Sequence, residues 1–197
     1  MKIVIIKYNA GNIRSVLFAL ERIGVEALVT DNPDLICTAD KIIFPGVGEA
    51  NSAMNYLKER RLDILIQNLK QPVLGVCLGM QLLCAHSEEN ETECLGIFSE
   101  TVKKFIPAVD KPLKVPQIGW NNIYDLNSSL FTGVTENSFC YFVHSYYAGL
   151  GETTIAKANY VQPYSAALHK GNFYGVQFHP EKSAGMGERI LKNFIQF

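Results

Sequence analysis

The chain has little net charge and no segment dominated by charge of one sign. Among its 197 residues, Lys and Arg number 18 and Asp and Glu number 19, which leaves a formal net charge of −1. Proteins that bind nucleic acid or an anionic membrane surface usually carry a basic patch or run. The composition therefore gives no reason to expect nucleic acid or a membrane as a partner.

Long hydrophobic runs are also missing. The apolar run Ile3–Ile6 stops at Lys7, so it has the length of a strand and is too short for a signal-peptide core or a membrane span. Hydrophobic residues make up 48% and charged residues 19% of the chain, which is typical of a globular protein. Because 197 residues suffice for one sizeable core and are few for two, we expect a single domain over residues 1–197.

Cysteine is scarce and its spacing is uninformative for metal binding. The five cysteines are odd in number and none forms a Cys-x-x-Cys pair. This favours reduced thiols in a cytoplasmic protein, one reactive and four buried, and predicts no metal site. The sequence also lacks a dinucleotide fingerprint and a phosphate loop, so no cofactor is expected. The cysteines are Cys37, Cys77, Cys84, Cys94 and Cys140.

The first half of the chain alternates apolar runs of strand length with stretches of helical periodicity. Strands are predicted over residues 3–6, 42–44 and 73–76, and helices over residues 16–23, over 54–69 as one or two helices, and over 78–85. This alternation predicts an α/β fold in which a mostly parallel sheet is flanked by helices on both faces. Reactive groups are then expected at the carboxyl ends of the strands.

The second half is built from short aromatic or β-branched segments separated by Gly, Asn and Pro, which predict strands. These segments lie near residues 101–105, 123–124, 139–143, 155–158, 166–168 and 173–178. We interpret them as a mostly antiparallel extension that carries His179 back toward Cys77. A closing helix is expected over residues 186–197.

Cys77 is the candidate nucleophile, because it stands between Gly75 and Gly79 directly after an apolar run. This Gly-x-Cys-x-Gly arrangement is analogous to the Gly-x-Ser-x-Gly elbow, in which glycines make room for a cramped strand-to-helix turn. A buried cysteine often acts only as a small hydrophobic residue. A core strand, however, has no need of glycine on both sides of a thiol.

A thiol nucleophile needs a base, and the base needs an orienting group. His179 and Glu181 lie two positions apart around Pro180, so the carboxylate can reach the far ring nitrogen. His86 leads into an acidic stretch that is typical of a solvated loop, and His169 lies beside a turn. His144 follows an apolar segment and is the strongest rival for the role of base.

The segment Pro45-Gly46-Val47-Gly48 follows a predicted strand. Alone it is most simply a loop, but its glycines also suit backbone N–H groups that stabilise an oxyanion. Beside the Cys77 elbow we favour the second interpretation. The other donor would be the N–H of Leu78, the residue after the nucleophile.

Two motifs together resemble those of class I glutamine amidotransferases of the Cys-His-Glu type. They are Gly-Val-Cys-Leu-Gly-Met-Gln at residues 75–81 and Phe-His-Pro-Glu-Lys-Ser at residues 178–183, and the resemblance runs essentially end to end. Residues 114–121 and 141–146 are similar to those of glutaminase subunits that serve a synthase of histidine biosynthesis. The resemblance thus implies hydrolysis of L-glutamine through a Cys77 thioester.

The resemblance also implies substrate contacts and a protein partner. Gln81 matches the contact to the amino-acid end of glutamine, and Tyr141, His144 and Ser145 are expected around the substrate. The partner implied is a cyclase subunit of (β/α)₈ barrel fold, which forms a heterodimer with the glutaminase and receives its ammonia. Three positions match residues that face this barrel: Asn12, Trp120 and Lys182. Core packing would also explain Trp120, and an ordinary surface charge would also explain Lys182.

In such enzymes the isolated glutaminase is nearly silent until the partner's ligand rearranges the loop at residues 45–48. We therefore hypothesise that Val47 rests in a backbone orientation that withholds the oxyanion donor. One departure is Lys7, where the family commonly has Asp. It leaves open a sister glutaminase that serves another synthase, such as one that amidates a surface sugar.

Two further functions are possible alternatives to an ammonia-supplying glutaminase. A binding or regulatory protein with a vestigial site would lack a member of the triad, and none is lacking. A free-standing cysteine peptidase would need an extended peptide groove, for which no segment provides a signature.

Overall fold

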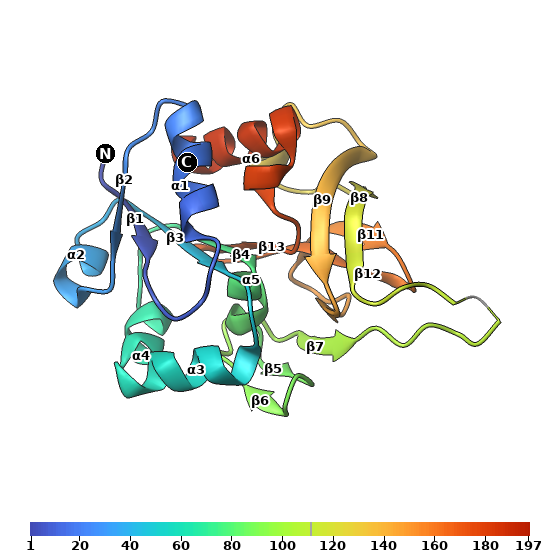
Figure 1. Cartoon of the computed structure of the whole chain (residues 1–197). Coiled ribbons are helices and arrows are strands. Elements are labelled where there is room, and N and C mark those ends of the chain that lie inside the picture. The colour runs from blue at the N-terminus through green and yellow to red at the C-terminus, as the bar shows by residue number, and fades with distance from the viewer. Residues whose placement is uncertain (111) are drawn as a thin grey trace.

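The computed structural model describes residues 1–110 and 112–197. Its centre is a seven-stranded sheet with the order β11-β12-β13-β4-β3-β1-β2 (Figure 1). From β2 to β13 the neighbouring strands are parallel, whereas β12 and β11 are antiparallel to their neighbours. The strands are β1 (Ile3–Ile6), β2 (Ala27–Thr30), β3 (Lys41–Gly46), β4 (Val73–Cys77), β11 (Thr154–Asn159), β12 (Pro163–Lys170) and β13 (Phe173–Val176).

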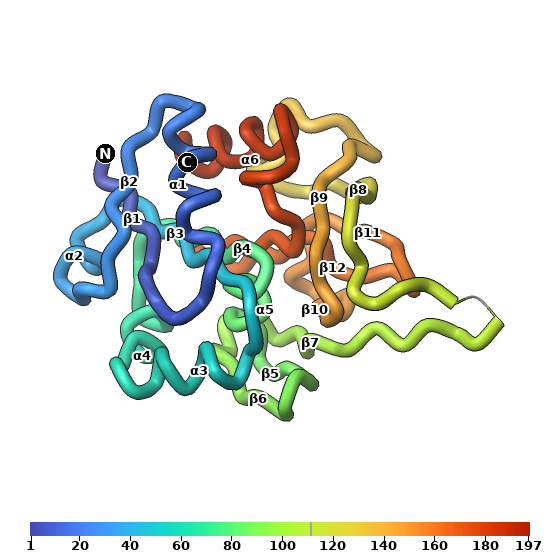
Figure 2. Tube along the Cα trace, in the orientation of Figure 1, coloured from blue at the N-terminus to red at the C-terminus, as the bar shows by residue number. Residues whose placement is uncertain are grey.

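Helices cover both faces of this sheet (Figures 1 and 2). On one face lie α1 (Ile13–Arg22) and α6 (Ala184–Gln196), and on the other lie α3 (Ala50–Glu59), α4 (Leu62–Gln67) and α5 (Leu78–Leu83). A short helix, α2 (Pro33–Cys37), follows the edge strand β2. The predicted α/β fold with a mostly parallel sheet is therefore confirmed.

Smaller sheets lie beside the carboxyl-terminal half of the large one. A two-stranded ribbon pairs β8 (Gln117–Ile123) with β9 (Ser138–His144). A four-stranded sheet has the order β10-β7-β5-β6. Its strands are β5 (His86–Ser87), β6 (Thr92–Glu93), β7 (Thr101–Lys104) and β10 (Tyr146–Ala148), and two 3₁₀ turns complete the elements, η1 (Ser129–Phe131) and η2 (Pro180–Lys182).

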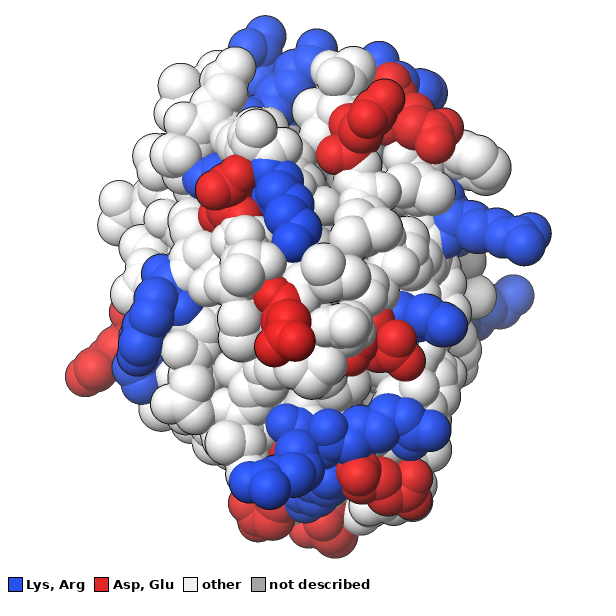
Figure 3. Space-filling view, turned by 90° about the vertical axis from the view of Figure 1, so that its left-hand side faces the viewer, with Lys and Arg blue, Asp and Glu red and all other residues white. Residues whose placement is uncertain are grey.

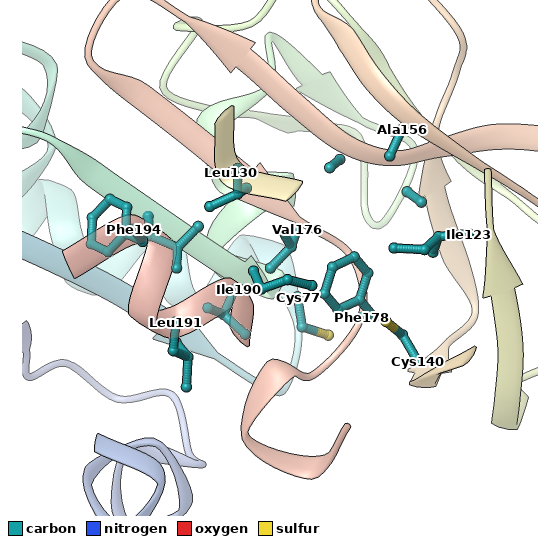
Figure 4. Packing of buried hydrophobic residues seen from close by; sticks show 14 of the residues in the cluster. Cys77, Ile123, Leu130, Cys140, Ala156, Val176, Phe178, Ile190, Leu191 and Phe194 are labelled. Atoms are coloured by element: carbon teal, nitrogen blue, oxygen red, sulfur yellow. The ribbon is translucent and has the colours of Figure 1, made fainter. Parts of the chain in front are cut away.

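The continuous apolar run of β1 is explained by burial on both sides. Because successive side chains of a strand point to opposite faces, Ile3 and Ile5 join the cluster under α1 and α6, while Val4 and Ile6 join the cluster under α3 and α5. Figure 4 shows the first cluster where Phe178 packs among residues of α6, β13 and β9. The site described below lies at the border of this packed interior.

Several expectations about local structure need correction. The segment at residues 173–178 belongs to the parallel part of the sheet, since β13 pairs in parallel with β4. His86, expected before a solvated loop, begins strand β5, and the predicted strand at residues 123–124 is the end of the longer β8. Strand β2 and helix α2 were not predicted. Of the four cysteines expected to be buried, Cys37 is exposed and Cys94 is only partly buried.

The surface carries mixed charge. Figure 3 shows the side of the molecule that lies at the left of Figure 1, where Lys and Arg side chains alternate with Asp and Glu. No helix within residues 1–110 and 112–197 is long and apolar enough to cross a membrane.

Close packing of α5 on β3 gives a first prediction, at Gly79. A Cβ atom at Gly79 would lie 1.8 Å from the carbonyl oxygen of Phe44, a backbone atom that cannot move aside, whereas a Cβ at Gly185 in α6 meets nothing within 4 Å. We expect Gly79→Ala to lower the free energy of unfolding by about 3 kcal/mol or more. Gly185→Ala is the matched control and should be neutral or stabilising by up to about 1 kcal/mol. Urea denaturation of the two variants measures both, and equal stability would contradict the prediction.

Candidate active site

Cys77 occupies a strained turn between β4 and α5. Its backbone has φ 54° and ψ −110°, which a residue with a side chain rarely adopts and which is found where a site requires it. Helix α5 begins at Leu78 and folds back over the sheet. Gly75 allows this return, because a Cβ there would lie 2.8 Å from the backbone nitrogen of Met80. The predicted strand-to-helix elbow is present.

The parallel pairing of the sheet surrounds Cys77 with residues from two other strands. On one side Gly46 of β3 pairs with Cys77, and on the other side Val176 of β13 pairs with Val76. Gln177 therefore follows β13 at the level of Cys77. The carboxyl ends of the three central strands thus meet at the nucleophile, as expected for a parallel α/β sheet.

His179 is held in place by its own backbone. Its N–H donates to the carbonyl of Tyr141 in β9 at 2.8 Å, and its carbonyl accepts from the hydroxyl of Ser183 at 2.7 Å. The Ser183 hydroxyl oxygen in turn accepts the N–H of Tyr141 at 2.9 Å. Strand β9 is therefore hydrogen-bonded to the residue before the η2 turn and to the residue after it. These bonds restrict the position of the His179 ring.

Glu181 orients this ring. Its Oε1 lies 2.7 Å from His179 Nδ1, and both side chains are buried. Burial alone would lower the pKa of His179, but the charge of Cys77 and hydrogen bonds with Cys77 and Glu181 outweigh burial and raise that pKa to about 10. The ring is therefore an imidazolium at neutral pH, next to the Cys77 sulfur.

Asn12 reaches this pair from the start of α1. Its Nδ2 donates to Glu181 Oε1 and lies 3.3 Å from His179 Nδ1. Because its side chain is engaged there, Asn12 makes no capping hydrogen bond to α1. The residue expected only at a partner surface thus also contacts the buried charge pair.

His144, the rival base, is committed elsewhere. Its Nδ1 donates to the carbonyl of Tyr146 at 2.7 Å, and its Nε2 faces the Tyr164 hydroxyl at 3.3 Å. Burial, reinforced by the charge of His179, lowers the pKa of His144 to about 4. A neutral ring with both nitrogens engaged cannot take a proton from Cys77, so the choice of His179 is supported.

A cavity of about 260 Å³ opens beside the Cys77 sulfur. Several of the predicted catalytic, oxyanion and substrate residues line it together, whereas Gly46, Tyr141, His179 and Glu181 do not. Gly46 lies beneath, where a Cβ would collide with the buried hydroxyl of Tyr8. Lining residues are Val47, Gly48, Cys77, Leu78, Gln81, Glu89, Pro116, Val143, His144, Ser145 and Tyr146.

Trp120, Tyr141 and Lys182 form a separate group on the outer face of the β8–β9 ribbon. The rings of Trp120 and Tyr141 meet edge to face at 5.9 Å, and Lys182 Nζ lies 5.9 Å from the centre of the Tyr141 ring. Tyr141 was expected to contact substrate. The structure instead places its side chain here and its backbone behind His179.

Two residues that sequence reasoning missed stand out at the site. Glu89, part of the stretch interpreted as a solvated loop, is half-buried in the cavity wall and accepts the N–H of Ala50 at 2.8 Å. Gln177 is fully buried, and its Nε2 donates to the Cys77 sulfur at 3.7 Å. In the sequence Gln177 stands two residues before His179, and this nearness could have indicated a role for Gln177 at the site. Its contact with the Cys77 sulfur, however, depends on the register of the strands.

Among residues 1–110 and 112–197, no group of three or more His, Cys, Asp or Glu side chains could hold a metal ion.

Comparison with known proteins identifies the family. Residues 4–197 match the family model described as glutamine amidotransferase class-I. The chain belongs to the class I glutamine amidotransferase family, which confirms the resemblance inferred from the two motifs.

Individual members of this family are similar to the chain over its full length. The chain is 57% identical over 195 residues to a protein of Bacteroides thetaiotaomicron named imidazole glycerol phosphate synthase subunit HisH, with 99% of each chain covered. It is 46% identical over 198 residues to the protein of that name from Escherichia coli, with both chains fully covered.

Solved structures support the same fold. A putative GMP synthase component from Thermoplasma acidophilum superposes with a TM-score of 0.75 at 19% identity, covering 100% of this chain and 93% of the other. At that identity the similarity concerns the fold alone.

The raised pKa of His179 predicts a pH-dependent contribution to stability. A group with pKa 6.5 when unfolded and about 10 when folded stabilises the fold fully below pH 6.5, and this contribution is lost as the pH rises toward 10. We expect the difference in unfolding free energy between wild type and His179→Gln to shrink steadily over that range in urea titrations. Gln67→Ala, which removes an uncharged side chain that donates to the Leu95 carbonyl, is the control and should show no such trend. Parallel profiles for all three proteins would contradict the assignment.

Proposed function

We propose that this chain is the glutaminase subunit of imidazole glycerol phosphate synthase. It would hydrolyse L-glutamine to glutamate and ammonia and pass the ammonia to a cyclase subunit of (β/α)₈ barrel fold. That subunit would make imidazole glycerol phosphate and AICAR in histidine biosynthesis. The observation that carries the proposal is the buried His179–Glu181 pair beside the Cys77 elbow, within a chain closely similar to proteins of that name.

The cavity suits the substrate. Glutamine carries an α-ammonium group, and Glu89 supplies a carboxylate on the cavity wall, while Gln81 and Ser145 add polar groups. The side-chain amide of glutamine would then point toward Cys77. Residues 1–197 would act as one amidotransferase domain in the cytoplasm.

The residues account for each chemical step. The Cys77 thiolate attacks the amide carbon of glutamine, and the oxyanion accepts the N–H of Leu78 and an N–H of the loop at Gly46, Val47 and Gly48. The His179 imidazolium protonates the leaving ammonia and then takes a proton from the water that attacks the thioester. Glutamate leaves, and the Cys77 thiolate and the His179 imidazolium are restored. Glu181 keeps the ring oriented throughout.

Control of the oxyanion loop fits the local backbone. Val47 is 38% exposed, and Gly48 adopts φ 124°, a conformation that glycine reaches at little cost. The peptide at Val47 can therefore turn over without unpacking the core. In the proposed resting state Val47 withholds its N–H until the partner subunit is engaged.

The outer face of the β8–β9 ribbon is the proposed docking surface for the barrel. Ile118, Trp120 and Phe139 point outward on this ribbon and are 64%, 53% and 59% exposed. Exposed apolar residues gathered on one face are typical of protein interfaces. Lys182 extends this surface next to the turn that carries His179. Asn12 donates a hydrogen bond to Glu181, so in the proposed heterodimer the interface is continuous with the reaction site.

The enzymatic proposal is tested by labelling with a diazo-ketone analogue of glutamine. Because the reagent needs a bound glutamyl group and an ionised thiol, we expect it to attach to Cys77 and not to the exposed Cys37. Mass spectrometry of the cysteine peptides shows the site. Cys77→Ser should lower glutamate release more than about 10³-fold. Equal labelling of both cysteines would rule out the proposed nucleophile.

The partner is tested by mixing the chain with the candidate barrel protein in the presence of its phosphoribosyl formimino ligand. Glutamate release should rise, and Trp120→Ala should weaken association by at least about tenfold, because exposed tryptophans commonly dominate interface energies. Ile64→Ala, an exposed residue of α4 at the other side of the molecule, is the control. A flat response to the ligand would favour a sister glutaminase with another ammonia acceptor.

A further inference from the structure

Gln177 is a fully buried polar residue to which the mechanism above gives no task. Its side chain lies between Cys77 and Gln81. Burying an amide is costly unless its polar atoms are satisfied, and both ends of this amide have partners. Oε1 accepts from Gln81 Nε2 at 2.9 Å, and Nε2 donates to the Cys77 sulfur at 3.7 Å.

The orientation of this amide is dictated by its neighbours. Gln81 Nε2 also donates to the backbone carbonyl of Tyr146 at 2.9 Å, and a carbonyl can only accept. The nitrogen of Gln81 must therefore face both Tyr146 and Gln177. If the Gln177 amide were turned over, two N–H groups would oppose each other. Gln177 must present its oxygen to Gln81 and its N–H to the sulfur.

The strand register explains why Gln177 meets the nucleophile. Val176, the last residue of β13, pairs with Val76 in parallel register, so Gln177 follows directly beside the end of β4, where its side chain contacts the Cys77 sulfur. On the other side of Cys77 stands Gly46, which has no side chain.

We propose that Gln177 is a positioning residue that directs a side-chain N–H to the Cys77 sulfur and is itself held by Gln81. The inference depends on the proposed role of Cys77 as the nucleophile. Gln177 does not touch the reacting carbonyl. It acts through the sulfur.

The contacts of the sulfur show how this operates. Besides Gln177 Nε2, the carbonyl oxygen of Val143 lies 3.8 Å from the sulfur. A neutral thiol donates its proton to that carbonyl, whereas a thiolate can only accept. When the sulfur is ionised beside the His179 imidazolium, the Gln177 N–H is a partner for its negative charge. The amide therefore favours the ionised, attacking form.

Other ionisable groups around the sulfur are accounted for. His179 faces it from the η2 turn and Tyr8 from the segment after β1, while Glu89, His144 and Tyr146 line the cavity beside the sulfur. None of them is bonded to Gln177. A change at Gln177 thus acts on the sulfur without removing any of these groups.

The link to Gln81 gives the arrangement a further consequence. Gln81 lines the cavity in which glutamine is proposed to bind, and it is also the residue that fixes the Gln177 amide. A ligand that shifts Gln81 therefore also shifts the hydrogen bond to the sulfur. Occupancy of the cavity and ionisation of Cys77 are connected through two side chains.

The decisive variant is Gln177→Glu, which keeps an oxygen toward Gln81 and replaces the N–H at the sulfur with a second oxygen. Iodoacetamide alkylation of the Cys77 peptide is followed by mass spectrometry as a function of pH. We expect the pH midpoint of alkylation to rise by about one unit or more, corresponding to about tenfold less thiolate on the rising limb. For glutamine hydrolysis, kcat should fall with little change in KM.

The matched control is Gln71→Glu, which also replaces an amide donor, the partly buried Nε2 that bonds to the Ile36 carbonyl. It lies before the opposite end of β4, and its alkylation midpoint should equal that of wild type. Gln177→Met, which has no donor and no charge, should raise the midpoint in the same direction and serves if the glutamate variant does not fold.

A folded Gln177 variant with an unchanged midpoint, within about 0.2 unit, would overturn the inference. If the glutamine analogue still labels wild-type Cys77, that result leaves the proposed glutaminase function intact. Loss of labelling in wild type would instead refute the function itself.

Discussion

The parallel pairing of β13 with β4 is the contact on which the site depends. Through the register of Val176 with Val76, it brings the segment that carries His179 alongside the strand that ends at Cys77. Neither side chain has any chemistry alone, because a thiol needs a base and an imidazole needs a carboxylate to hold it. A slip of one residue would turn the Gln177 side chain to the opposite face of the sheet. It would also move His179 away from Cys77. The hydrogen bonds between β9 and the turn that carries His179 then hold His179 beside Cys77.

Electrostatics and burial act in opposite directions at His179, and electrostatics prevails. Interactions with Cys77 and Glu181 raise the pKa of His179 to about 10 against the effect of burial. Burial lowers the pKa of His144 to about 4, although its hydrogen bond to the Tyr146 carbonyl acts in the other direction. The positive charge at His179 further discourages protonation of His144. One fold thus keeps a charged imidazolium next to Cys77 and a neutral imidazole close to it in space.

Much of this arrangement could be predicted from the sequence, and the failures have physical causes. The triad and the elbow were found because glycines around Cys77 and the spacing of His179 and Glu181 are local signals. Strand β2 and helix α2 were missed because an edge strand is only partly buried and a five-residue helix shows little periodicity. The roles of Glu89 and Gln177 were missed because each depends on contacts with distant strands. Local pattern reveals residue chemistry, but side-chain direction depends on register and tertiary packing.

The position of Val143 has a consequence for how contact at the ribbon reaches the cavity. Val143 lines the cavity, and its carbonyl oxygen lies 3.8 Å from the Cys77 sulfur. On the ribbon Val143 is paired directly with Ile118, an outward-facing residue of the apolar surface, and directly paired side chains share one face of an antiparallel ribbon. A single residue of β9 thus adjoins both the cavity and the apolar surface, so a displacement of β9 at that surface would move the carbonyl that faces the sulfur.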